Sequence, residues 1–125
     1  MSILFYSTLQ NSNEWRRKIK KKFKNENIIS IYNKSKFDEV NVAIVWNLPN
    51  QILNKLPNLK IIFSLGAGVD HILKLNDYNG TPIVRIKDPL MGELMYYYAL
   101  SQILNFQVGI NDYKIAQKYK VWRKE

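Results

Sequence analysis

The residues with the clearest chemical potential form a glycine loop made of Gly66, Ala67, Gly68 and Val69. The loop follows an apolar run at residues 61–63, which predicts a strand of a parallel sheet covered by helices on each side. Glycines at the carboxyl end of a strand let backbone N–H groups approach a ligand, and a following helix start adds partial positive charge. The loop therefore predicts a small anion site for a carboxylate or a phosphate. A tight strand-to-helix turn without a ligand is the alternative.

The loop departs from the fingerprint of dinucleotide-binding proteins. A third glycine is expected where His71 stands, and the acid expected about twenty residues further on is at best Asp88, between Lys87 and Pro89. A small anion fits this loop better than a nucleotide pyrophosphate.

Catalytic constellations are missing from the sequence. One histidine and no cysteine give no set of metal ligands, and no serine stands in a GxSxG motif. A general base at His71 needs an orienting carboxylate, and Asp70 lies on a different helix face, so a surface or capping histidine is favoured. The sequence thus predicts a binding site with no catalytic residue and no metal.

Three predicted strand ends meet at one edge of an open α/β sheet, where ligands bind. They are Tyr6-Ser7, Trp46-Asn47 and the glycine loop. Trp46 is expected to form the apolar wall of a pocket whose floor is the loop backbone, which suits a small organic acid. Trp46 as a core residue at a strand end is the alternative.

The segments that must position these residues alternate between strand and helix. Strands are expected at 3–6, 28–32 (near an edge), 42–46 (central), 61–63 and 83–86, which is the pattern of an open α/β sheet of about five parallel strands. Apolar residues at four-residue spacing (Trp15, Ile19 and Phe23) predict an amphipathic helix. Short helices are expected at 51–56 and at 70–75, the second capped by the Asp70 carboxylate.

A long helix is predicted after the sheet. Asp88 and Pro89 form a helix start, and the segment from Leu90 to about Tyr119 has helical character with a weakening at Gly109. Its apolar residues lie on several faces, so it is expected to pack on another subunit or on a further domain. We therefore divide the 125 residues into a sheet core at about 1–88 and a long helix at 89–119.

The composition argues against nucleic acid and membrane partners. The formal net charge is +9, but its densest source, Arg16 to Lys24, is a lysine-rich helix face without interleaved exposed aromatic residues. Solvation of the surface explains it better than nucleic-acid binding. The N-terminus lacks the features of a secretory signal, and no apolar run reaches the length of a membrane span. We expect a cytoplasmic protein.

Four segments together resemble a known family: VWNLP (45–49), FSLGAGVDHIL (63–73), PIVRIKD (82–88) and MGELMYYYALSQIL (91–104). They are similar to the N-terminal portion of D-isomer-specific 2-hydroxyacid dehydrogenases, closest to the glyoxylate/hydroxypyruvate reductase A branch. The resemblance implies a flavodoxin-like substrate domain whose long helix lies in a dimer interface. It also implies reduction of glyoxylate or hydroxypyruvate by NADPH or NADH in full-length relatives.

The resemblance also implies roles for individual residues. The backbone of the glycine loop would hold the substrate carboxylate, Trp46 would line the pocket, and Met91 and Gly92 would lie near the domain cleft. The family's nucleotide-binding Rossmann domain and its catalytic Arg, Glu and His come after the point where these 125 residues end, and neither Arg85 nor His71 matches their positions. We therefore expect a truncated or split substrate-binding half that binds no cofactor and is inactive alone. The alternative is a free-standing module for small carboxylates or for protein interaction.

Overall fold

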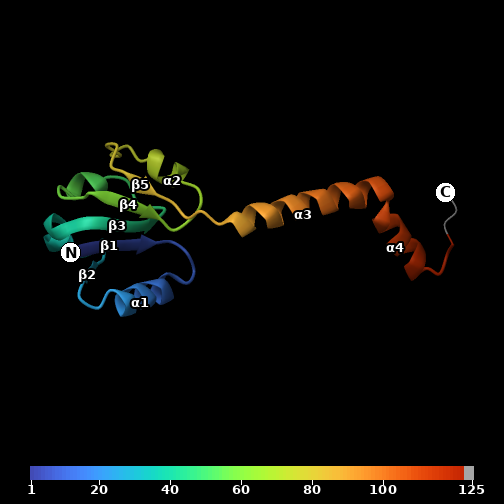
Figure 1. Ribbon diagram of the computed structural model, residues 1–125, viewed down its shortest axis with the longest axis horizontal. Coiled ribbons are helices and arrows are strands. Elements are labelled where there is room, and N and C mark those ends of the chain that lie inside the picture. The colour runs from blue at the N-terminus through green and yellow to red at the C-terminus, as the bar shows by residue number, and fades with distance from the viewer. Residues whose placement is uncertain (123–125) are drawn as a thin grey trace. The chain divides into compact units, whose positions relative to one another are not determined.

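The computed structural model describes residues 1–122 and divides into two compact units. The first unit, Met1–Lys87, contains a five-stranded sheet (Figure 1). Its strands are β1 (Ser2–Ser7), β2 (Asn27–Ile29), β3 (Val40–Trp46), β4 (Ile61–Ser64) and β5 (Ile83–Val84). All neighbouring strands are parallel, in the order β2-β1-β3-β4-β5. The predicted α/β class, the central strand and the edge position of the second strand are confirmed, but the strand expected at 28–32 is shorter and ends at Ile29.

Four helical segments connect the strands. They are α1 (Ser12–Lys22), the 3₁₀ segments η1 (Lys34–Glu39) and η2 (Leu53–Lys55), and α2 (Asp70–Leu73). The sequence did not predict η1, whose apolar content is a single buried residue, Phe37. Both helices expected at 51–56 and 70–75 are shorter than predicted, because each carries one buried anchor (Leu53 and Ile72) and therefore one packed turn.

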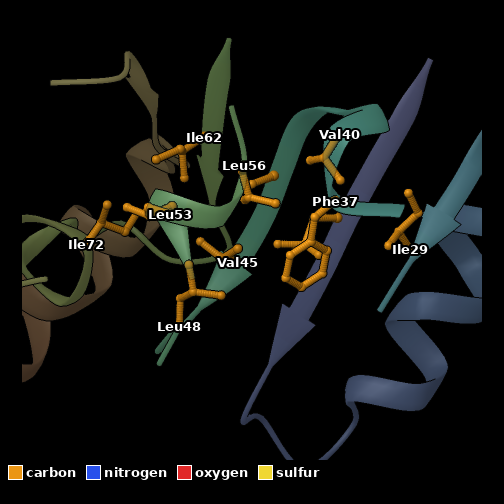
Figure 2. Close-up of a cluster of buried hydrophobic side chains, with 11 residues drawn as sticks. Ile29, Phe37, Val40, Val45, Leu48, Leu53, Leu56, Ile62 and Ile72 are labelled. Atoms are coloured by element: carbon orange, nitrogen blue, oxygen red, sulfur yellow. The ribbon is translucent and has the colours of Figure 1, made fainter. Parts of the chain in front are cut away.

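The hydrophobic core lies on one face of the sheet. Alternate residues of the strands point to opposite faces, so Leu4, Val45 and Ile62 share the core face. Figure 2 shows Val45 and Ile62 among side chains of the connecting segments. The cluster consists of Leu4, Ile29, Phe37, Val40, Ala43, Val45, Leu48, Leu53, Leu56, Ile62 and Ile72. The 3₁₀ segments and α2 therefore close this face.

The opposite face of the sheet is covered only in part: Ile3 and Phe5 of β1 are buried there, but β4 is not covered, contrary to the prediction that helices cover the strand at 61–63 on both sides. Phe63 of β4 is 37% exposed. A groove of about 540 Å³ lies between the sheet and α1, lined by strand residues such as Ile44 and by the predicted α1 stripe, Trp15, Ile19 and Phe23. The helix α1 buries no residue completely, because one narrow apolar stripe cannot cover five strands. The apolar run of β4 thus has one covered side.

The second unit begins at Asp88 and contains α3 (Pro89–Val108) and α4 (Ile110–Lys118). The Asp88 carboxylate accepts the Leu90 N–H at 3.0 Å, with Pro89 at the first helical turn, as the sequence predicted. The helix expected over 89–119 is divided at Gly109, where the sequence predicted a weakening; Gly109 has φ 66° and ends α3 in the left-handed conformation. No residue of α3 is buried within residues 1–122. No helix in the described chain is long and apolar enough to cross a membrane.

Candidate functional site

The three predicted strand ends meet at one edge of the sheet. Ser7 of β1 lies opposite Trp46 of β3, and Val45 of β3 lies opposite Ser64 of β4. Beyond these pairs, the Asn47 side-chain amide donates to the Thr8 hydroxyl at 3.3 Å. The glycine loop follows β4 directly, so the register brings Trp46 and the loop together.

A buried serine, Ser64, organises the glycine loop. Its hydroxyl donates to the Gly68 carbonyl at 2.9 Å and accepts the Gly66 N–H at 3.3 Å. The His71 Nε2 atom lies 3.0 Å from the same oxygen. A hydroxyl has one proton and two lone pairs, and three contacts use them all. Ser64 therefore fixes the loop on both sides of Ala67.

The tautomer of His71 follows from its partners. Its Nδ1 accepts the Asn47 N–H at 3.3 Å, so the ring proton lies on Nε2 and is donated to Ser64. Asn47 has φ 52°, a left-handed conformation that asparagine tolerates well, and this conformation accompanies the N–H contact with the ring. His71 thus links β3 to β4 inside the site, whereas the sequence favoured a surface or capping histidine.

The environment of His71 lowers its pKa from the ordinary value of 6.5, first because burial disfavours the charged ring, while the Asp70 carboxylate acts in the opposite direction. The unfolded chain then binds more protons than the folded chain below pH 6.5. We expect stability to be constant above that pH and to fall as the pH drops through the lowered pKa. Urea unfolding at about pH 7.5 and about pH 5.5 measures this, and His71→Gln should remove most of the difference.

The Trp46 indole packs against both His71 and the loop. Its ring centroid lies 4.5 Å from that of His71 at an interplanar angle of 53°. A Cβ built on Gly66 would lie 2.3 Å from Cζ3 of Trp46, whereas one on Gly68 would meet the movable carboxylate of Asp70 at 2.9 Å. The positive-φ glycines of residues 1–122 are Gly80 and Gly109, outside the loop. Gly66 is therefore required for close packing under the indole and not for an unusual backbone angle.

Three backbone donors of the loop make no hydrogen bond within the described chain: the N–H groups of Ala67, Gly68 and Val69. The Gly66 N–H is bonded to Ser64, so it is not available to a ligand in this conformation. The predicted Asp70 cap is wrong, because Val69 is the N-cap residue of α2 and no side chain caps it. With four residues, α2 also supplies little of the helix dipole that the sequence interpretation invoked.

Arg85 comes to the loop from the neighbouring strand. Its Nη1 donates to the Ala67 carbonyl at 3.1 Å. Val84 pairs with Phe63, so the residue after β5 lies beside the end of β4. Sequence reasoning assigned Arg85 no role and placed it within a strand at 83–86, whereas β5 ends at Val84. The guanidinium adds positive charge at the loop.

The remaining predicted residues belong to the second unit. Met91 and Gly92 are in the first turn of α3, in the second unit, and their proximity to a cleft stays a prediction. No group of three or more His, Cys, Asp or Glu side chains within residues 1–122 is arranged to hold a metal ion. The loop does not fit a dinucleotide pyrophosphate, because its helix has a single turn and His71 replaces the last glycine.

Comparisons with known proteins agree with the resemblance seen in the sequence. No family model matches the chain. It is 31% identical over 129 aligned residues to glyoxylate/hydroxypyruvate reductase A of Serratia proteamaculans, covering 98% of this chain and 41% of that protein. A probable 2-hydroxyacid dehydrogenase from Rhizobium etli, solved with NADP, HEPES and L(+)-tartaric acid, aligns with a TM-score of 0.76 at 26% identity over 99% of this chain and 40% of that one.

A second solved structure gives the same result. The D-isomer specific 2-hydroxyacid dehydrogenase from Xanthobacter autotrophicus, in complex with NADPH and MES, has a TM-score of 0.73 at 26% identity and covers 99% of this chain. The chain spans about two fifths of the length of these relatives. Over that span, the predicted resemblance to the D-isomer-specific 2-hydroxyacid dehydrogenases, and to the glyoxylate/hydroxypyruvate reductase A branch among them, is confirmed.

Proposed function

We propose that this chain is the substrate-binding and dimerisation half of an NAD(P)H-dependent 2-hydroxyacid dehydrogenase that acts on glyoxylate or hydroxypyruvate and is inactive alone. The observation that carries the proposal is the glycine loop, which offers the unbonded N–H groups of Ala67, Gly68 and Val69. The similarity to glyoxylate/hydroxypyruvate reductase A supports it along the whole chain.

The carboxylate of the substrate would be bound by these backbone donors. Unbonded N–H groups of one loop can bind a carboxylate without a formal charge, and the Arg85 guanidinium, which donates to the Ala67 carbonyl, makes the potential at the loop more positive. Trp46 would contact the carbon skeleton of the acid, while Gly66 lets the indole approach the loop.

The cofactor would be bound outside the residues described. Structural relatives are solved with NADP or NADPH, which transfers hydride in dehydrogenases. The donors found in this chain hold and orient an acid, and none of them is placed for proton transfer to it. A nucleotide-binding partner segment would therefore supply the catalytic groups.

The test is to titrate glyoxylate into the ¹⁵N-labelled chain and to assay NADPH and NADH oxidation with and without an added nucleotide-binding half of a related enzyme. We expect chemical-shift changes centred on residues 67–69, no turnover alone, and turnover after complementation. Turnover by the chain alone would refute the proposal. Binding without turnover in both assays would favour the alternative of a free-standing carboxylate-binding module.

The second unit is expected to form the contact with a partner subunit or domain. Its helices expose large apolar side chains on several sides, among them Met95, Leu104 and Phe106, the last 88% exposed. Water-exposed apolar area of this kind favours association. We expect the chain to self-associate at tens of micromolar, below the millimolar range of weak contacts, as measured by sedimentation velocity. Leu94→Gln with Leu104→Gln should reduce association, the control Lys118→Gln should not, and a monodisperse wild-type monomer would contradict the prediction.

A further inference from the structure

A closed chain of hydrogen bonds connects β3, β4 and α2 to the glycine loop. The Asn47 N–H is donated to His71, His71 donates to Ser64, and Ser64 donates to the Gly68 carbonyl. The Gly66 N–H donates to the Ser64 hydroxyl. The donors and acceptors of these hydrogen bonds are mutually consistent, and Ser64 is buried. Nothing in the proposed chemistry of substrate binding uses these side chains directly.

We infer that Ser64 and His71 are positioning residues that hold the glycine loop in the shape that receives a carboxylate. This inference rests on the proposed function and deepens it. Ser64 engages the residues on either side of Ala67, and the N–H groups of residues 67–69 are thereby left without internal partners. A loop fixed before binding loses less conformational entropy when the ligand arrives.

These hydrogen bonds require the neutral form of His71. A protonated ring carries N–H groups on both nitrogens, so Nδ1–H would face the Asn47 N–H, and two donors repel. The ring faces uncharged groups from β3 and β4, namely Trp46, Asn47 and Ser64, and its charged neighbour is Asp70 on its own helix. Protonation of His71 at low pH therefore breaks its hydrogen bond with the Asn47 N–H after β3, and no acceptor within residues 1–122 replaces Asn47 there.

The first arm of the test measures glyoxylate affinity of the full chain by calorimetry. Ser64→Ala should raise Kd about tenfold, because two hydrogen bonds that shape the loop are lost. Ser30→Ala is the matched control, since its hydroxyl accepts the Tyr32 N–H just after β2, at the edge of the sheet away from β4 and the loop. An unchanged Kd in a folded Ser64→Ala protein overturns the inference.

The second arm varies pH, which a purely structural role would not couple to binding. Wild-type Kd should rise as the pH falls below 6.5, while glyoxylate stays ionised. His71→Gln should have a weaker Kd that does not change over the same range, because an amide does not titrate. A flat wild-type profile, or an equal slope in His71→Gln, overturns the inference.

A third readout separates this inference from the proposed function. Amide exchange of residues 66–69 in the ligand-free protein should be faster in Ser64→Ala and His71→Gln than in the wild type and in Ser30→Ala. If the wild type binds no glyoxylate, the proposed function fails, and these exchange rates alone decide whether the pair holds the loop. Equal exchange in all four proteins overturns the inference, and His71→Gln gives the answer if Ser64→Ala does not fold.

Discussion

Replacing Gly66 with alanine is expected to weaken glyoxylate binding at least about tenfold and to cost about 1–3 kcal/mol of stability. The new methyl group would lie 2.3 Å from Cζ3 of the Trp46 indole, far inside van der Waals contact. The indole also packs against the His71 ring, so moving it disturbs the ring that supports the loop. Calorimetric titration and urea unfolding of the variant measure the two effects.

The matched control is Gly68→Ala in the same loop. Its methyl group would meet only the Asp70 carboxylate oxygen at 2.9 Å, and that side chain is exposed and can rotate away. We expect a much smaller loss of stability than for Gly66→Ala. Similar losses for the two variants would show that general loop strain, and not the Trp46 contact, explains the effect.

A double-mutant cycle tests the contact itself. Trp46→Ala removes the indole, so Gly66→Ala should cost much less stability in that background than in the wild type. The coupling is expected to be favourable by about 1–2 kcal/mol, within the range for side chains in contact. Additive effects would show that the stability lost in Gly66→Ala does not come from the contact with Trp46.

The strands could be predicted from sequence because their signals are local. The uniformly apolar segment at residues 42–46 indicates a central strand, and β3 is central. The more polar 28–32 segment indicates an edge, and β2 lies at the edge. What the sequence did not predict is which face of β4 is covered, because that depends on how far α1 reaches across the sheet. The face of β4 that is not covered lines an apolar groove between the sheet and α1.

The site was predicted in part. Strand order and strand ends bring Trp46 and the glycine loop together, and both follow from the general rule for open α/β sheets. The roles of Ser64 and His71 were missed because they depend on register and side-chain direction across strands, which spacing along the chain does not encode. Asp70 was assigned as the cap for the opposite reason: its local position fits, but the helix begins at Asp70 itself, one residue earlier than a cap at Asp70 requires.

The largest stability effect is expected for Ile72→Ala, at about 3 kcal/mol within the range for buried aliphatic truncation. Ile72 is 0% exposed and belongs to the core cluster, and it follows His71 directly in the single turn of α2. Such a loss is a large fraction of the roughly 5–15 kcal/mol that stabilises a domain.

The neighbouring variant Leu73→Ala is the control, because Leu73 is in the same turn but 53% exposed. It should cost less than about 1 kcal/mol, since little of its apolar area is buried on folding. Urea unfolding followed by circular dichroism compares the two, with unchanged m-values confirming the same transition. Because Ile72 is the buried anchor of the turn that carries His71, loop amide exchange should rise in Ile72→Ala and stay unchanged in Leu73→Ala. Equal costs for the two variants would mean that α2 is not anchored through the core, and the position of His71 would then need another support.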